Sequence, residues 1–206
     1  MSPRRSIKAC SCAVVALALL AVVGCSKVSH DDAKSYAPAP SPVAAPCPGN
    51  EAVVDPTLLA FLSKARAIHH EADLAEDAGD KAGAVRALDE LVVGPVPGGA
   101  SPPPEAVEVL ADTRARLADL RSALGQSEAA ERDVEVGLRL ATQPTHFRGH
   151  LYEVLGVVYE RRAKAQADAG NAAAADRAKR QAVEAYQRAV AVQDEVIRRA
   201  LPPTRR

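Results

Sequence analysis

The chain has 206 residues, of which 48% are hydrophobic and 25% are charged, and its formal net charge is zero. Without the first 24 residues, it carries 23 basic and 26 acidic residues. This weakly acidic balance argues against a general nucleic-acid binder, which would be markedly basic. The length suffices for one ordinary domain and an additional segment.

The first 24 residues have the pattern of an export signal. Arg4, Arg5 and Lys8 form a positively charged start, and residues 9–23 are small and apolar apart from one serine and two cysteines. This apolar stretch is shorter than the roughly 20 residues that span a bilayer, which is typical of a cleaved signal peptide. The order Val-Val-Gly-Cys at 22–25 resembles the cleavage site of bacterial lipoproteins, although valine stands at 22 where that family prefers leucine.

The lipoprotein resemblance implies cleavage before Cys25 and attachment of lipid, including palmitate, to its sulfur. We therefore expect a protein of the cell envelope that is anchored to a membrane. Ser26 is compatible with sorting to the outer membrane, facing the periplasm. Cys47 would then be the only other cysteine of the mature chain, so no internal disulfide framework is expected.

The rest of the chain divides into a linker and a helical domain. Residues 25–50 are rich in proline and alanine, which favours an extended segment without a fixed fold. Residues 51–206 are rich in Ala, Leu, Glu and Arg, and no short alternating runs of β-branched or aromatic residues indicate strands. The pattern predicts an all-α domain whose six helices form three pairs, with turns at 79–80, 125–126 and 170–171 inside the pairs. The expected helices are 56–78, 82–93, 104–124, 127–142, 147–168 and 172–200.

The three pairs share the spacing of small and large apolar residues, and this spacing resembles tetratricopeptide repeats. The resemblance implies a short α-solenoid of about three helical hairpins, the last of which is elongated. Glu71 and Arg121 depart from the family pattern, which has leucine and tyrosine there. The matching residues are Ala72, Gly79, Ala84, Leu88 and Leu91; then Leu117, Ala118, Gly125, Ala130, Val134 and Gly137; then Tyr152, Leu155, Gly156, Tyr159, Ala182, Tyr186 and Ala189.

The repeat pattern predicts where helices cross closely. Ala130 and Ala182 are small, so two helix backbones can approach each other there. Leu88, Val134 and Tyr186 lie one turn away, where we expect large buried side chains to fill the remaining space.

In the tetratricopeptide family, particular first-helix positions line an inner groove. Transferred to this chain, the resemblance gives a predominantly acidic lining and implies a partner with a basic segment. The alternative is that the acidic face only keeps the protein soluble. The transferred positions are Arg66, His69, Asp73, Glu76 and Asp77; Asp112, Ala115, Asp119, Ser122 and Ala123; and His150, Glu153, Val157, Glu160 and Arg161. The acidic residues expected to bind the partner are Asp73, Glu76, Asp77, Asp112, Asp119, Glu153 and Glu160.

The two halves of the domain differ in charge. Residues 51–141 contain 17 acidic and 9 basic residues, whereas residues 161–206 contain 11 basic and 5 acidic residues. With the resemblance, this asymmetry favours a lipid-anchored protein-interaction scaffold that assists assembly of a secretion, pilus, motility or outer-membrane complex. The alternative is a structural lipoprotein that contacts peptidoglycan or lipid head groups through its basic C-terminal helix.

The sequence contains no strong catalytic or metal-binding motif. His69, His70 and Glu71 start like a zinc-protease helix, but Leu74 stands where its second histidine is required. His146 and His150 are four residues apart, but two ligands alone make a weak metal site. We therefore expect surface histidines and no enzymatic activity, metal, cofactor, small-molecule substrate or nucleic-acid partner. An enzyme using Glu153 or Glu160, or a metal-binding protein, is the third alternative.

Overall fold

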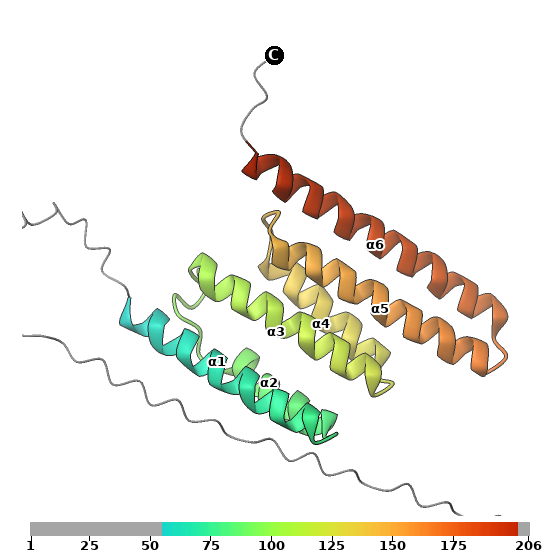
Figure 1. Cartoon of the computed structure of the whole chain (residues 1–206), viewed down its shortest axis with the longest axis horizontal. Helices are drawn as coiled ribbons and strands as arrows, with labels where there is room; N and C mark the ends of the chain where they lie inside the picture. The colour runs from blue at the N-terminus through green and yellow to red at the C-terminus, as the bar shows by residue number, and fades with distance from the viewer. Residues whose placement is uncertain (1–54, 202–206) are drawn as a thin grey trace, which may run out of the picture. The chain divides into compact units, whose positions relative to one another are not determined.

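The computed structural model describes residues 55–201, which form six α-helices and no strand (Figure 1). The helices are α1 Pro56–Asp77, α2 Lys81–Val93, α3 Pro104–Ala123, α4 Ser127–Leu140, α5 His146–Asp168 and α6 Ala172–Ala200. They pack as sequential pairs, so the predicted all-α architecture is confirmed. None of these six helices has an apolar stretch long enough to cross a membrane. The export signal, Cys25 and the linker lie outside the described residues.

The two helices of each pair are joined by the same turn. Gly79, Gly125 and Gly170 have φ values of +79°, +77° and +77°. The amide of each glycine donates to the carbonyl three residues earlier, and the next amide donates to the carbonyl five residues before it. This is the Schellman arrangement, in which glycine is favoured because a Cβ would be strained at positive φ. The predicted turns are therefore confirmed, and the three pairs share one connection.

Helix α4 ends at Leu140, two residues before the predicted end. The Nη1 atom of Arg148 on α5 donates to the carbonyl oxygens of Leu138 at 2.9 Å and Ala141 at 2.5 Å. A side chain from the next helix thus satisfies carbonyls that would otherwise need another helical turn. Pro144 also disfavours helical backbone at the residue before it. The hydrogen bonds from Arg148 and the backbone restriction before Pro144 therefore both act to end α4 before the third pair begins.

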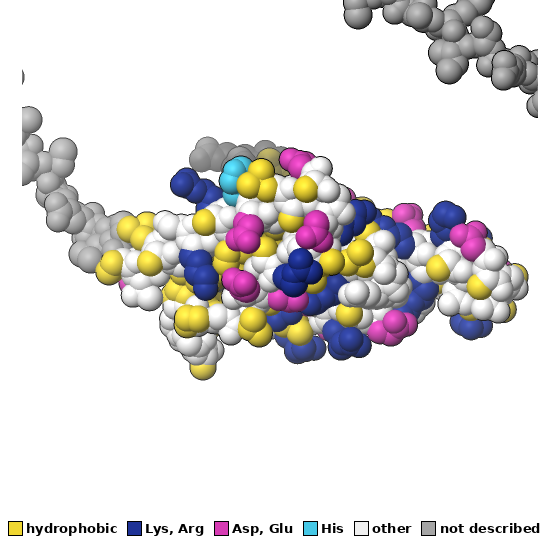
Figure 2. Space-filling model, turned by 90° about the horizontal axis from the view of Figure 1, so that it is seen from below, with side chains coloured by type: hydrophobic (Ala, Val, Ile, Leu, Met, Phe, Trp, Pro, Cys, Tyr) yellow, Lys and Arg dark blue, Asp and Glu magenta, His cyan; other side chains and the backbone are white. Residues whose placement is uncertain are grey.

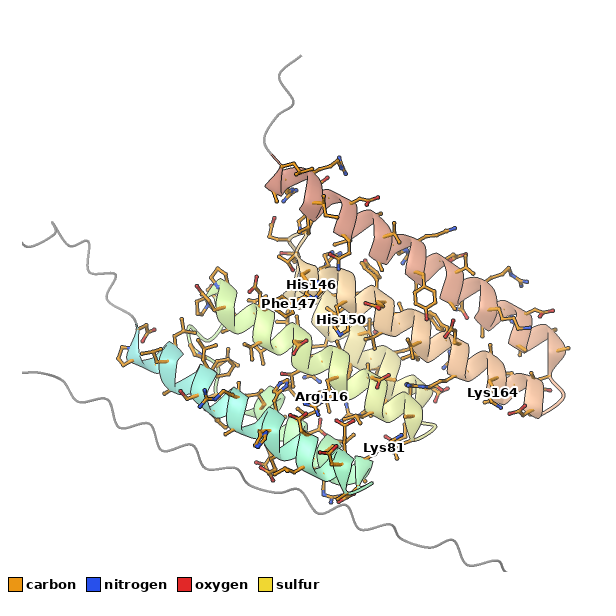
Figure 3. All side chains as sticks on the ribbon, in the orientation of Figure 1. Lys81, Arg116, His146, Phe147, His150 and Lys164 are labelled. Atoms are coloured by element: carbon orange, nitrogen blue, oxygen red, sulfur yellow. The ribbon has the colours of Figure 1, made fainter. Side chains whose placement is uncertain are left out.

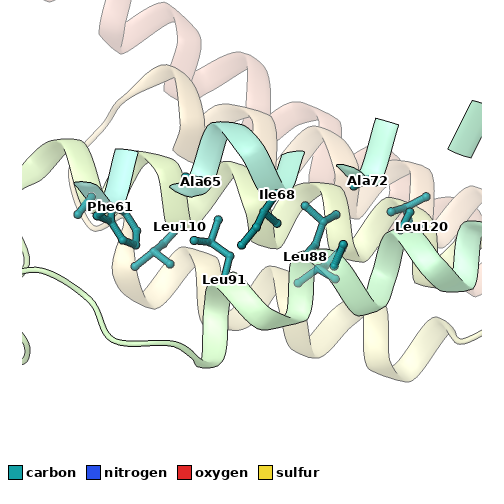
Figure 4. Packing of buried hydrophobic residues seen from close by; sticks show 12 residues of the cluster. Phe61, Ala65, Ile68, Ala72, Leu88, Leu91, Leu110 and Leu120 are labelled. Carbon is teal, nitrogen blue, oxygen red and sulfur yellow. The ribbon is translucent and has the colours of Figure 1, made fainter. Parts of the chain in front are cut away.

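Two apolar clusters hold the first five helices together, and α3 contributes to both. The first core joins α1, α2 and α3 (Figure 4). The second core joins α3, α4 and α5. The first core consists of Phe61, Ala65, Ile68, Ala72, Ala84, Ala87, Leu88, Leu91, Ala106, Leu110, Leu117 and Leu120. The second consists of Ala111, Ala115, Ala118, Ala130, Val134, Ala141, Leu151, Val154 and Val158.

The last pair is packed differently, because every buried residue of α6 is an alanine. These residues are Ala175, Ala178, Ala182, Ala185 and Ala189. On α5, a Cβ added at Gly156 would lie 2.5 Å from Cε1 of Tyr186, so the tyrosine ring covers the glycine. Ala130 and Ala182, where the sequence predicts close helix crossings, are both buried.

The expected burial of the large repeat residues is confirmed at two of three positions. Leu88 and Val134 are fully buried. Tyr186 is only half-buried, which corrects the prediction. The reason is that α6 packs against α5 and against no other helix among residues 55–201. One side of the tyrosine therefore stays in contact with solvent.

Candidate functional site

Side chains from the first helix of each pair line one hollow, which we call the groove. Helices α1, α3 and α5 follow one another in chain order along the molecule (Figure 1). The groove has a volume of about 390 Å³. Its lining residues are His69, Asp112, Ala115, Arg116, Asp119, His150, Glu153, Val154 and Val157. Seven of these nine were transferred from the tetratricopeptide pattern, and the structure brings these seven together in one hollow.

The seven acidic residues expected to bind a partner are not equally placed. Three of them, Asp112, Asp119 and Glu153, line the groove. Two others, on α1, are ion-paired to Arg116 of the groove lining: Asp73 and Glu76. The remaining two, Asp77 and Glu160, are not part of the lining.

Arg116 and Val154 are the two groove residues that the transferred positions lack, and Arg116 is the charged one. Its side chain reaches from α3 toward α1 (Figure 3), where Nη2 lies 2.6 Å from Asp73 Oδ1 and 2.5 Å from Glu76 Oε1. Its Nη1 atom also donates to the carbonyl oxygen of His69 at 3.2 Å. Burial lowers the pKa of Arg116, but the hydrogen bonds and charges of Glu76 and Asp73 outweigh this and raise the pKa above its ordinary value. One arginine thus offsets part of the negative charge that Asp73 and Glu76 give to this edge of α1.

A second contact of the same kind joins α3 to α5. Arg161 Nη1 donates to Asp119 Oδ1 at 2.8 Å and to the Asp119 carbonyl oxygen at 2.9 Å, and it also contacts Ser122 Oγ. In both contacts, an acid on one first helix binds an arginine on the next first helix. The two acid–arginine separations are 43 residues for Asp73 to Arg116 and 42 residues for Asp119 to Arg161. This near-equal spacing was the sequence signal that could have revealed Arg116.

His69 is half-buried in the groove, which corrects the expectation that it lies on the surface. Its Nε2 atom lies 2.9 Å from Thr113 Oγ1, and that hydroxyl donates to the Val109 carbonyl oxygen at 2.8 Å. Because the hydroxyl proton is used, Thr113 accepts a hydrogen bond from the Nε2–H tautomer. Burial lowers the pKa of His69, and Arg116 lowers it further, against the opposite effects of Asp112 and Asp73. Burial in the groove therefore favours the neutral form of the imidazole.

The other histidines of the groove region lie at the start of α5. The rings of His146 and His150 are stacked with their centroids 6.2 Å apart (Figure 3). His150 Nδ1 lies 3.3 Å from Glu153 Oε2. Among residues 55–201, no three His, Cys, Asp or Glu side chains are grouped so that they could hold a metal ion.

Away from the groove, a buried carboxylate explains why arginine replaces the expected tyrosine at 121. Asp133 on α4 has a side chain that is only 3% exposed, and it binds both Arg114, at 2.7 Å, and Arg121. Arg121 Nη2 also lies 2.7 Å from both carboxylate oxygens of Asp89 on α2. Burial lowers the pKa of Arg121, but Asp133 and Asp89 raise it above its ordinary value. One side chain thus connects three helices through two carboxylates.

The face of the molecule shown in Figure 2 carries mixed charge. On the face shown in Figure 2, acidic and basic side chains lie next to one another across the middle of the molecule.

Comparison of the chain with protein-family models, with curated proteins and with solved structures finds no significant match.

Proposed function

We propose that the helical domain is a protein-interaction module whose groove binds a basic segment of a partner protein. One observation is the main support: side chains from α1, α3 and α5 line a single hollow of about 390 Å³. Six of its nine lining residues are charged or histidine and three are apolar, so the hollow can offer both charge and apolar contact to a partner. A surface assembled from three helix pairs can contact an extended or helical segment along its length.

The uncompensated acids of the groove favour a basic ligand. Asp112 forms no ion pair with any of residues 55–201, and Glu153 contacts only the histidine three residues before it. A Lys or Arg side chain that enters between these carboxylates would gain complementary charge. Its aliphatic stem would contact the apolar lining, which consists of Ala115, Val154 and Val157.

We further propose that the three pairs are tetratricopeptide-like repeats of a short α-solenoid. The common glycine turns support this, as do the acid–arginine contacts that recur between successive first helices. The Val-Val-Gly-Cys sequence at 22–25 supports a lipid anchor on Cys25, which we place at the outer membrane facing the periplasm. The protein would then be a tethered scaffold that assists assembly of an envelope complex.

The anchor is tested by Cys25→Ser in the full chain. Only a thiol accepts the lipid through a thioether, so the variant should lose metabolic labelling with a fatty-acid analogue and leave the membrane fraction. Labelling and membrane retention equal to those of the wild type would refute the anchor. This result would leave the groove proposal untouched, because the groove lies within residues 55–201.

The groove is tested first by photo-crosslinking in intact cells. A photoreactive residue in place of Val157, in the groove, should give adducts with a discrete partner. The matched control carries the same residue in place of Arg139, an exposed position on α4 that does not line the groove. Equal adducts from both positions would indicate contact without preference for the groove.

The second test measures binding of the purified partner to the full chain. Asp112→Asn combined with Glu153→Gln should weaken binding about tenfold, slow association and reduce its dependence on salt. Helical circular dichroism should remain unchanged, since both side chains are solvent-accessible. If Arg198→Gln with Arg199→Gln abolishes binding while the groove variant binds normally, the groove assignment is wrong. The basic C-terminal helix would then be the binding element.

A further inference from the structure

One flank of α6 is an apolar strip with no helix against it. Val183, Val190 and Ile197 repeat every seven residues and are 55%, 60% and 55% exposed. Seven-residue spacing places them on one side of the helix, over about 21 Å. Arg188 on the opposite flank reaches back over the ring of Tyr152 on α5, with 6.0 Å between its guanidinium carbon and the ring centroid. We call the exposed residues 183, 190 and 197 the α6 strip.

The corresponding positions in the two earlier pairs are covered by the next helix. Ala84, Ala130 and Ala182 occupy matching positions in the three pairs. In each pair, the residue directly after this alanine corresponds to Val183, and the residue seven positions further on corresponds to Val190. In α2 these are Val85 and Val92, which pack against the first core together with α3. In α4 the first is Glu131, which contacts Arg162 of α5 at 2.5 Å, and the second is Leu138, which packs against the second core. The α6 strip is therefore the place where another helix would dock, and Figure 1 shows α6 at the end of the stack.

We propose that a second copy of this chain docks on the α6 strip, with the two α6 helices antiparallel. Val183 of each copy then faces Val190 of the other, and one two-fold axis relates both contacts. Val183 and Val190 of each copy are thereby covered, whereas Ile197 lies at the end of the contact, opposite Asp176 of the second copy. The contact closes on itself, so it yields a dimer and not a filament.

The charges beside the strip select a second copy in antiparallel orientation. When Val183 faces Val190 of the second copy, the opposite direction of the helices places Lys179 opposite Asp194 of the second copy, and this pair occurs twice. Asp194 forms no ion pair with any of residues 55–201, and Lys179 has only an exposed contact with Asp176 at 3.6 Å. In a parallel arrangement, Lys179 would lie beside Lys179 of the second copy and Asp194 beside Asp194 of the second copy. Both contacts would be repulsive. The helix is therefore complementary to itself in one orientation only.

The inference goes beyond the proposed groove function and does not depend on it, because the α6 strip and the groove share no residue. The first test is sedimentation equilibrium of the full chain in density-matched detergent. The wild type should sediment with the mass of two chains. Val190→Glu should raise the dimer dissociation constant at least about tenfold, because it places a charge in the centre of an apolar contact. The matched control is Leu59→Glu, which changes a residue of similar exposure on α1 and should leave the dimer intact.

Charge reversal tests the orientation of the two helices. Lys179→Asp should weaken the dimer, because the introduced carboxylate would lie opposite the carboxylate of Asp194 in the second copy. The double variant Lys179→Asp with Asp194→Lys should restore the wild-type dissociation constant. Helical circular dichroism monitors folding in every variant. A wild-type chain that is monomeric at all concentrations overturns the proposal and leaves the strip to a different protein. A dimer that Val190→Glu and Leu59→Glu affect equally, or that the double variant does not restore, also overturns it.

Discussion

The two ends of the helical domain are built from different side chains. The first pair contributes Phe61, Ile68, Leu88 and Leu91 to a core that α3 closes from the other side. The last pair is joined by a row of alanines on α6 and by Gly156 on α5, which the ring of Tyr186 covers. Large residues interlock three helices at one end, whereas small residues join only two helices at the other.

This difference indicates where stability and binding surfaces lie. An alanine buries a single methyl group, so a row of alanines removes much less apolar area from water than a row of leucines. The last pair therefore depends on close backbone contact over a long interface, and it leaves the outer flank of α6 open. We expect the first pair to tolerate truncation of its large residues poorly and the last pair to tolerate added volume poorly.

The largest expected effect is that of Leu88→Ala in the first core. Leu88 is fully buried between α1, α2 and α3, so its truncation should cost about 2–5 kcal/mol of unfolding free energy. Chemical denaturation monitored by circular dichroism gives this value. Tyr186→Ala in the last pair is the comparison, and it should cost less because the tyrosine is half-exposed. A larger loss for Tyr186→Ala would reverse the ranking of the two ends.

Asp133→Asn probes the buried carboxylate that connects the two cores. Arg114 would lose its charged partner, while Arg121 would keep Asp89. We expect a cost of about 2 kcal/mol, because both arginines retain some contact with solvent. The matched control is Asp168→Asn, which breaks an exposed pair with Lys164 and should not measurably destabilise the protein. Equal denaturation midpoints for both variants would show that Asp133 is not a structural centre.

The sequence allowed the helices, the turns and much of the groove to be predicted, because periodicity, glycine and proline act locally. Seven groove residues followed from the position of each first helix in its pair. Arg116 and Arg121 could not be assigned in the same way, since their partners lie on other helices and depend on how the pairs stack. The predicted burial of Tyr186 is wrong for a related reason. Its burial requires a helix beyond α6, and local spacing does not reveal whether one is present.

Ala182→Leu probes the close crossing of the last pair. Ala182 is buried on α6, and a larger side chain there would force the two backbones apart at a cost of about 1–3 kcal/mol. Amide hydrogen exchange should show reduced protection in α5 and α6, with α1 and α2 unchanged, because the two ends have separate cores. Gln181→Leu, at the exposed position on the other side of Ala182 in the sequence and outside the α6 strip, should leave the exchange pattern of both helices as in the wild type. Unchanged exchange and melting in Ala182→Leu would mean that the helices do not cross at this residue.

The smallest expected effect concerns the pH dependence that His69 adds in the groove. Burial holds the pKa of His69 below the ordinary value of 6.5, so the unfolded chain takes up a proton at higher pH than the folded chain does. The stability that the neutral imidazole provides is therefore present above pH 6.5 and is lost as the pH falls from 6.5 through the folded pKa. His69→Gln keeps a donor for Thr113 but does not titrate.

Urea denaturation of His69→Gln and the wild type, at intervals from pH 8 to pH 5, measures this effect. The two curves of unfolding free energy should be parallel above pH 7, where the imidazole is neutral in both states. Below pH 6.5 the wild type should lose stability faster, because only its unfolded state gains that proton readily. Contributions from all other groups are common to both proteins and cancel in the difference. If the two curves stayed parallel down to pH 5, His69 would titrate alike in the folded and unfolded chains, and its burial in the groove would have no effect on its charge.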